Sequence, residues 1–218
     1  IGVFFPRQSN FSADIAHEIR TPITNLVTQT EIALSQSRSP QELEEVLYSN
    51  LEEFSRMSRM VSDMLFLAQA DNNQLIPEQR ALDLADEVHK VFEFFEAWAE
   101  EKAVALRFVG SPCRVTGDPL MLRRAISNLL SNAIRYTPAG QAVTIQLSES
   151  AETVRLVVEN PGMPIAAEHL PRLFDRFYRV DPSRQRKGEG SGIGLAIVKS
   201  IVGAHHGSVA AQSDMRST

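Results

Sequence analysis

A histidine followed by a carboxylate and a hydroxyl is the first group in the sequence able to do chemistry. His17 precedes Glu18 directly, and Thr21 follows four residues after the histidine. Ile15 and Ile19 define the buried stripe of the predicted helix, so His17, two positions from each, projects away from it. An exposed imidazole can act as a nucleophile while Glu18 takes a proton from its other ring nitrogen. Thr21 shares that face and can hold a water, although an isolated histidine of this kind is more often only a solvated polar residue.

A pair of asparagines, Asn128 and Asn132, forms a second pattern. Residues four apart lie on one helix face. Two amide oxygens there can complete the octahedral shell of a Mg²⁺ ion that is held mainly by phosphate oxygens. Arg135 can reach a phosphate, and Tyr136 can pack against a nucleobase. The alternative is an ordinary amphipathic helix. Because asparagine is unfavourable inside helices, two of them on one helix face require an explanation.

Four glycines at alternate positions, Gly188, Gly190, Gly192 and Gly194, precede an apolar helical pattern. They allow backbone amides to approach an anion at a helix N-terminus. The stretch does not fit the phosphate loop, because no lysine follows at the required place. It does not fit the dinucleotide fingerprint, because Leu195 stands where a third small residue is needed. A flexible loop without a ligand is the alternative.

Two segments between these motifs are less specific. Residues 160–165 predict a tight turn after a strand. Residues 173–181 hold an aromatic cluster that leads into a basic loop with Arg184, Arg186 and Lys187. Taken singly, each segment is more readily explained as structural.

The composition is that of an ordinary globular protein. Its 218 residues are 43% hydrophobic and 22% charged, enough for one large domain or two smaller ones. The formal charge of -5 argues against generic nucleic-acid binding. Cys113 is the only cysteine, which excludes an internal disulfide and a thiolate metal site. No apolar run reaches the roughly 18 residues of a membrane span.

Two long amphipathic helices are predicted before residue 71. Apolar residues recur at helical spacing in residues 10–37, and a heptad-like seam runs from Pro40 to about Ala70, with Ser39 as the N-cap. The short connection predicts an antiparallel hairpin. Two helices alone leave half of each apolar seam exposed to water, so we expect a homodimer that forms a four-helix bundle. The alternative is a hairpin docked on the C-terminal part of the same chain.

The polar, helix-breaking residues Asp71 to Pro77 mark the predicted domain boundary. We expect one domain over residues 8–73 and another over residues 77–218. Mixed helices and strands in the second predict an α+β chain with a two-layer α/β sandwich. Helices are predicted over residues 84–101, 118–136 and 193–204, and strands over residues 104–109, 143–147, 154–159 and 208–211.

The order and spacing of these motifs, over roughly residues 10–213, resemble the sensor histidine kinases of two-component signalling. In detail they are similar to the copper- and silver-responsive members. The resemblance implies an ATP-dependent autokinase that phosphorylates His17, with Glu18 as the base, and passes the phosphoryl group to an aspartate of a response regulator. It makes Thr21 the residue needed for phosphatase action on that regulator. It also implies a homodimer and the cytoplasmic portion of a bacterial inner-membrane sensor, with a sandwich of the Hsp90-like ATPase type.

The resemblance also assigns the residues that contact Mg²⁺ and ATP. Asn128 and Asn132 hold the metal, and Gly162 sits under the adenine. Phe174 and Phe177 anchor a lid from which Arg179 and Arg184 reach the phosphates. The remaining members of the implied nucleotide site are Arg135, Tyr136, Asn160, Ile165, Gly190, Ser191, Gly192, Ile193, Gly194 and Leu195.

Two departures from the family pattern carry consequences. Asn160 stands where the family usually has an aspartate that accepts a hydrogen bond from adenine, and Pro164 replaces the usual second glycine. We therefore expect adenine binding that persists but is weakened. The family also continues into a final strand beyond the position of Thr218, so we expect an edge strand to be missing. Two rival functions are an ATPase of the same fold that phosphorylates no histidine, and a dimeric scaffold with degenerate ATP binding.

Overall fold

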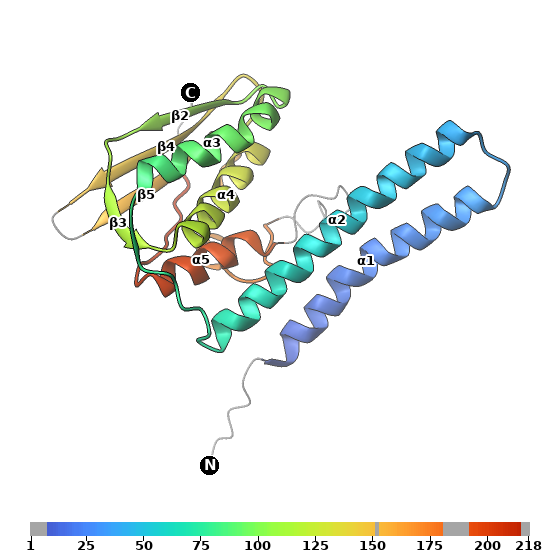
Figure 1. The fold of residues 1–218 in the computed structure, drawn as a ribbon, viewed down its shortest axis with the longest axis horizontal. Helices are drawn as coiled ribbons and strands as arrows, with labels where there is room; N and C mark the ends of the chain where they lie inside the picture. The colour runs from blue at the N-terminus through green and yellow to red at the C-terminus, as the bar shows by residue number, and fades with distance from the viewer. Residues whose placement is uncertain (1–7, 151–152, 181–191, 215–218) are drawn as a thin grey trace, which may run out of the picture. The chain divides into compact units, whose positions relative to one another are not determined.

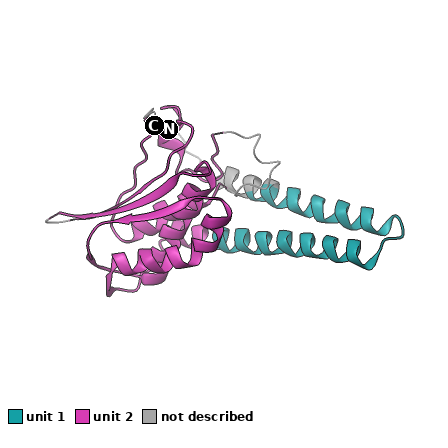
Figure 2. Cartoon of the chain, turned by 90° about the horizontal axis from the view of Figure 1, so that it is seen from above, with its two compact units in different colours: residues 1–65 teal, residues 66–218 magenta. Residues whose placement is uncertain are grey.

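The protein is described here by a computed structural model that covers residues 8–150, 153–180 and 192–214. Within helix α1 the side chains of residues 8–14 and 17 are not described. The chain forms two compact units, Ile1–Leu65 and Phe66–Thr218, shown in teal and magenta in Figure 2. None of the described helices is both long and apolar enough to cross a bilayer.

The first unit is a hairpin of two long helices. Helix α1 spans Gln8–Leu34 and helix α2 spans Pro40–Asp71, so α2 continues into the second unit. The start of α2 is a capping box: the amide of Glu42 donates to Ser39 Oγ over 3.3 Å, and the Ser39 amide donates to Glu42 Oε2 over 2.8 Å. The predicted hairpin and the N-cap at Ser39 are therefore confirmed.

The hairpin buries only part of its apolar surface within one chain. Leu26, Ala33 and Met60 are buried. Between the helices, the side-chain amide of Asn50 donates a hydrogen bond to Thr30 Oγ1 over 3.4 Å. Large apolar side chains that are 41–67% exposed also lie along both helices: Ile23, Val27, Ile32, Leu43, Leu47, Leu51, Phe54, Val61 and Leu65. These side chains, referred to below as the exposed apolar stripe, are apolar surface that the two helices do not cover within one chain.

The second unit is a two-layer α/β sandwich. Its elements after α2 are β1 (Arg80–Asp83), α3 (Leu84–Glu101), β2 (Ala105–Val109), β3 (Arg114–Gly117), α4 (Pro119–Tyr136), β4 (Ala142–Glu149), β5 (Val154–Glu159), the 3-10 turn η1 (Leu170–Arg172) and α5 (Gly194–Ala204). The main sheet has the order β2-β4-β5, with β2 parallel and β5 antiparallel to β4. The predicted fold class is confirmed; the small antiparallel pair β1-β3 was not predicted.

The core lies between the sheet and helices α3 and α4, which cover the same face of the strands (Figure 1). Along β4, Val143, Ile145 and Leu147 are buried, and the residues between them are not. That alternation is the period of a strand with one face on the core. Leu130 and Ile134 supply the α4 side of the core at a spacing of four residues.

The strand predicted over residues 208–211 is wrong. These residues form no strand and are followed by irregular backbone up to Asp214. A strand is held by a ladder to a neighbour, and this segment has no such ladder among the described residues. Further along, the Ser213 hydroxyl accepts the amide of Ile165 over 2.9 Å.

The start of α4 is fixed by a network around Asp118. Its carboxylate accepts hydrogen bonds from the amides of Leu120 and Met121 over 2.9 and 3.0 Å. It also accepts one from the amide of Glu78 over 3.1 Å. The Asp118 amide itself donates to Nε2 of His205, at the end of α5, over 3.0 Å. Burial would raise the pKa of the Asp118 carboxyl, but the three amide donors and His205 together lower it.

Replacing Asp118 with alanine should therefore destabilise the protein in a pH-dependent way. Loss of an N-cap costs about 1–2 kcal/mol in the free energy of unfolding at neutral pH. Because the pKa is lowered in the folded state, this stabilisation is fully present above the unfolded value of about 3.9 and is lost as pH falls below it. Urea unfolding of the wild type and Asp118→Ala between pH 7 and pH 3 measures the difference.

The matched control is Asp86→Ala, which removes an exposed carboxylate from the first turn of α3. It should change the free energy of unfolding by no more than about 0.5 kcal/mol. An Asp118→Ala effect that stays constant down to pH 3 would contradict the assignment.

Candidate nucleotide-binding site

Helix α4 divides its residues between the core and a polar face. Ile126, Leu130 and Ile134 are buried, whereas Asn128 and Asn132 are half-buried on another face of the helix. The Asn128 Nδ2 donates to the carbonyl of Arg124 over 3.0 Å. This bond orients the side-chain amide and leaves its Oδ1 as an acceptor.

The Oδ1 atom of Asn128 lies against the first residue of α5. A methyl group added to Gly194 would lie 3.0 Å from it, closer than side chains normally approach. Ile193, the N-cap of α5, is buried and makes no side-chain capping bond. The side chain of Ile193 therefore satisfies none of the amides in the first turn of α5, and amides at the start of a helix are groups that can bind an anion.

The turn after β5 approaches the end of the same helix. A methyl group on Gly162 would lie 3.1 Å from the carbonyl oxygen of Tyr136, the last residue of α4. In this turn the Nδ2 of Asn160 donates to the carbonyl of Pro161 over 3.3 Å, which leaves the amide oxygen as an acceptor. Tyr136 and Arg135 are both exposed at this end of α4.

A third close approach joins Phe177 to Gly192. The Phe177 amide donates to the Gly192 carbonyl over 2.9 Å. A methyl group on Gly192 would lie 3.0 Å from the Phe177 backbone, and the φ of Gly192 is +70°. Only glycine combines that conformation with that space at low cost. Phe174 and Arg179 are half-buried near this junction in the sequence.

The structure thus brings Asn128 next to Gly194, Tyr136 next to Gly162, and Phe177 next to Gly192. The amide of Ile165 donates to the Ser213 hydroxyl, and Leu195 is half-buried in the first turn of α5. Three predicted site residues, Arg184, Gly190 and Ser191, lie outside the described residues.

The predicted phosphorylation segment lies on α1, in the first unit. His17 belongs to this helix, but its side chain is not among those described. Glu18 is half-buried, Thr21 is exposed, and Pro22 lies within the helix.

Two contacts in the second unit were not predicted from the sequence. Arg176 forms a two-pronged ion pair with Asp71 at the end of α2, with Nη1 at 2.6 Å from Oδ2. The guanidinium of Arg124 lies 4.3 Å from the centre of the Phe66 ring. No local pattern could have indicated either pair, because the partners are far apart in the sequence.

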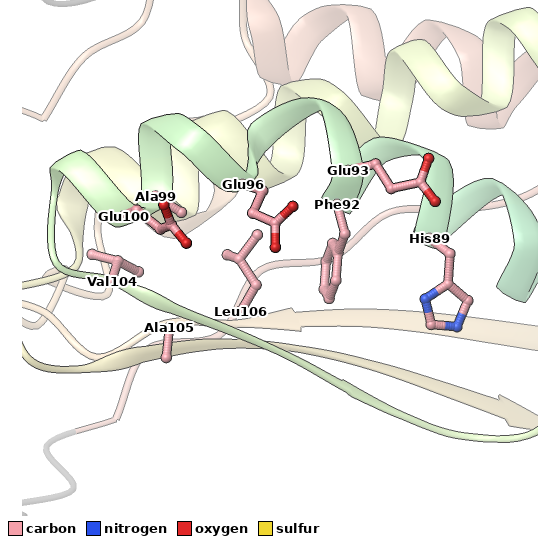
Figure 3. A pocket seen from close by; sticks show the side chains of 9 residues that line it. All are labelled: His89, Phe92, Glu93, Glu96, Ala99, Glu100, Val104, Ala105 and Leu106. Carbon is pink, nitrogen blue, oxygen red and sulfur yellow. The ribbon is translucent and has the colours of Figure 1, made fainter.

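A cavity of about 470 Å³ lies elsewhere, between α3 and the edge strand β2 (Figure 3). Its apolar floor includes Phe92 and Leu106, and three glutamates on α3, Glu93, Glu96 and Glu100, stand along it. None of the predicted site residues lines this cavity. The candidate site is therefore defined by the glycine approaches and not by this hollow.

A helical hairpin followed by an α/β sandwich, with paired asparagines beside a glycine-led helix, is the architecture of a histidine kinase core. Residues 7–73 match the His Kinase A (phospho-acceptor) domain family, and residues 117–218 match the family described as histidine kinase-, DNA gyrase B- and HSP90-like ATPase. The second match implies ATP binding.

The proteins to which this chain is similar are histidine kinases as well. The chain is 76% identical to the sensor histidine kinase CusS of Escherichia coli (strain K12), over 98% of this chain and 45% of that protein. It is 67% identical to the probable sensor kinase SilS of Salmonella typhimurium, over 98% of this chain and 44% of that protein. The solved structure of the Acinetobacter baumannii histidine kinase AdeS is 28% identical, with a TM-score of 0.73 and 86% of each chain covered. The chain belongs to the sensor histidine kinases and spans less than half the length of these two relatives.

Replacing Gly194 with alanine should weaken the binding of Mg²⁺-ATP on the order of tenfold, because the new methyl group displaces the Asn128 amide. Titration calorimetry with Mg²⁺-ATP measures the change. Gly203→Ala is the matched control in the same helix, because outside the neighbouring backbone of α5 no described atom lies within 4 Å of its added methyl group. Equal affinities in the two variants would contradict a role for the Gly194–Asn128 approach.

Proposed function

We propose that this chain binds Mg²⁺-ATP in its second unit and transfers the γ-phosphoryl group to His17. The observation that carries the proposal is the meeting of three glycines with the predicted site residues: Gly194 with Asn128, Gly162 with Tyr136, and Gly192 with Phe177. Close backbone approach beside polar side chains is what a phosphate-rich ligand needs.

In the proposed reaction the lone pair of one His17 ring nitrogen attacks the γ-phosphorus. The bond between that phosphorus and the bridging β–γ oxygen breaks, and ADP leaves with the electron pair. Glu18 takes the proton from the other ring nitrogen. Catalysis then consists mainly of alignment and of charge placed where negative charge gathers.

The oxygen donors of the site suit Mg²⁺. Asn128 and Asn132 offer two amide oxygens from one face of α4, and magnesium accepts few protein ligands when phosphate oxygens supply the rest. The metal supplies neutralisation of the phosphate charge when it is bound. Arg135 and Arg179 are proposed to contact the phosphates, and Asn160 and Tyr136 the adenine.

The proposed division of labour requires two domains that move. We assign residues 8–73 to dimerisation and phosphotransfer and residues 77–218 to ATP binding, with residues 71–77 as the hinge. A histidine on one domain and a nucleotide on the other must come together for transfer. In the first domain, the exposed apolar stripe of α1 and α2 favours a homodimeric four-helix bundle.

Downstream and upstream roles are proposed from the relatives. The phosphoryl group passes to an aspartate of a response regulator, and Thr21 supports removal of phosphate from that regulator. The similarity to CusS and SilS favours copper or silver as the stimulus of the whole protein. The chain is then the cytoplasmic portion of a longer, membrane-anchored bacterial sensor.

Incubation with ATP that carries a radioactive γ-phosphate tests the central reaction. The wild type should acquire a label that is stable in base and labile in acid, and peptide mapping should place it on His17. His17→Ala should reduce the label to background, because the nucleophile is gone, while its affinity for ATP stays unchanged. Persistent ATP hydrolysis without any histidine label in the wild type would favour the rival ATPase.

Replacing Asn160 with aspartate should strengthen ATP binding about fivefold, since a carboxylate gives a charge-assisted bond worth about 1 kcal/mol more than an amide oxygen. Calorimetric titration of both proteins measures the difference. Binding of GTP, which lacks the adenine amino group, should not improve. A clear loss of ATP affinity in Asn160→Asp would exclude this role for residue 160.

A further inference from the structure

Two interactions hold the side chain of Tyr178, the residue that precedes Arg179, and a third contact lies beside them at His169. The Nδ1 of His169 lies 2.6 Å from the Tyr178 hydroxyl, and the guanidinium of Arg172 lies 4.2 Å from the centre of the tyrosine ring. The Oε1 of Glu168 lies 3.7 Å from the other histidine nitrogen, Nε2. The tyrosine hydroxyl can donate to an unprotonated Nδ1 or accept from a protonated one, so the pair can form a hydrogen bond in either tautomer.

Between these side chains, three backbone hydrogen bonds each join a residue to the third residue before it. The amide of Arg172 donates to the carbonyl of His169 over 3.0 Å, that of Asp175 to Arg172 over 2.9 Å, and that of Tyr178 to Asp175 over 3.4 Å. The first of these bonds belongs to η1. The His169–Tyr178 hydrogen bond therefore joins the two ends of a single wound segment, residues 169–178.

The residue before Tyr178 is held in an unfavourable conformation. Phe177 has a φ of +58°, which is rare for a bulky residue. Such a conformation persists only where the surroundings determine it. On one side the Phe177 amide donates to Gly192, and on the other Tyr178 is held by His169 and Arg172. The direction in which the chain leaves at Arg179 is therefore fixed by contacts on both sides.

We propose that His169 and Tyr178 are positioning residues that hold Arg179 where it meets the phosphates of ATP. The proposal deepens the function proposed above and rests on it, because it takes Arg179 as a phosphate contact. His169 acts through the tyrosine hydroxyl, the tyrosine acts through the backbone, and neither has to touch the nucleotide.

The test compares variants of the full 218-residue chain in Mg²⁺-ATP titrations and in autophosphorylation kinetics. Tyr178→Phe removes only the hydroxyl and keeps the ring under Arg172. His169→Leu removes the ring nitrogen that bonds the tyrosine hydroxyl. Each should raise the Kd and the KM for ATP about 3- to 10-fold, as loss of one hydrogen bond predicts, while kcat changes less than about twofold.

Two further variants separate positioning from stability. His169→Asn keeps a hydrogen-bonding atom near the position of Nδ1 and should restore most of the affinity. The double variant His169→Leu with Tyr178→Phe should be no worse than either single variant, because both remove the same bond. In an Arg179→Ala background, Tyr178→Phe should have no further effect.

Tyr48→Phe is the control, since it removes an exposed hydroxyl from α2 in the first unit. Unchanged ATP affinity in Tyr178→Phe and His169→Leu, with only a lower unfolding temperature, would show that the bond merely stabilises the fold and would overturn the inference. So would additive losses in the double variant.

The failure of the proposed function gives a different result. A wild type that binds ATP but labels no histidine refutes the autokinase reaction, and the affinities of the variants still decide the role of His169. A wild type that binds no ATP refutes both proposals.

Discussion

The approach of α5 to α4 at Gly194 is the constraint on which the candidate site depends. No side chain larger than hydrogen fits beside the Asn128 amide without displacing it. The same approach brings the start of α5, whose N-cap residue Ile193 makes no side-chain capping bond, next to the polar face of α4. The first turn of α5 and the side-chain amide of Asn128 thus become neighbours because one residue lacks a Cβ atom.

Helix α4 is held in place by contacts at its first turn and along its buried face. Asp118 caps its first turn through the amides of Leu120 and Met121, and His205, at the end of α5, accepts a hydrogen bond from the Asp118 amide. The remaining face of the helix is packed into the core through Leu130 and Ile134, which are almost fully buried. A helix held in this way can present asparagines, which weaken a helix interior, without loss of order.

The hairpin and the sandwich use apolar surface in different ways. In the sandwich the alternating residues of β4 meet α3 and α4, so one chain completes its own core. In the hairpin the second half of the seam stays exposed along both helices. This contrast agrees with a first unit whose burial is completed by a further surface and a second unit whose described helices and strands form a core within one chain.

Local sequence was sufficient to predict most of the helices and strands. Periodicity and capping residues were sufficient for α3, α4, the hairpin helices and the β4–β5 pair, because each depends on residues near in the chain. The spacing of four residues predicted that Asn128 and Asn132 share one face of a helix, and the structure confirms this for α4. The small strands β1 and β3 escaped prediction, and the expected strand over residues 208–211 did not form, since a strand depends on a neighbour that local sequence does not specify. The contacts of Gly194 with Asn128, of Arg176 with Asp71 and of His169 with Tyr178 became visible only in the folded chain. Those contacts arise when distant segments pack in three dimensions, and packing of that kind leaves no periodic trace in the sequence.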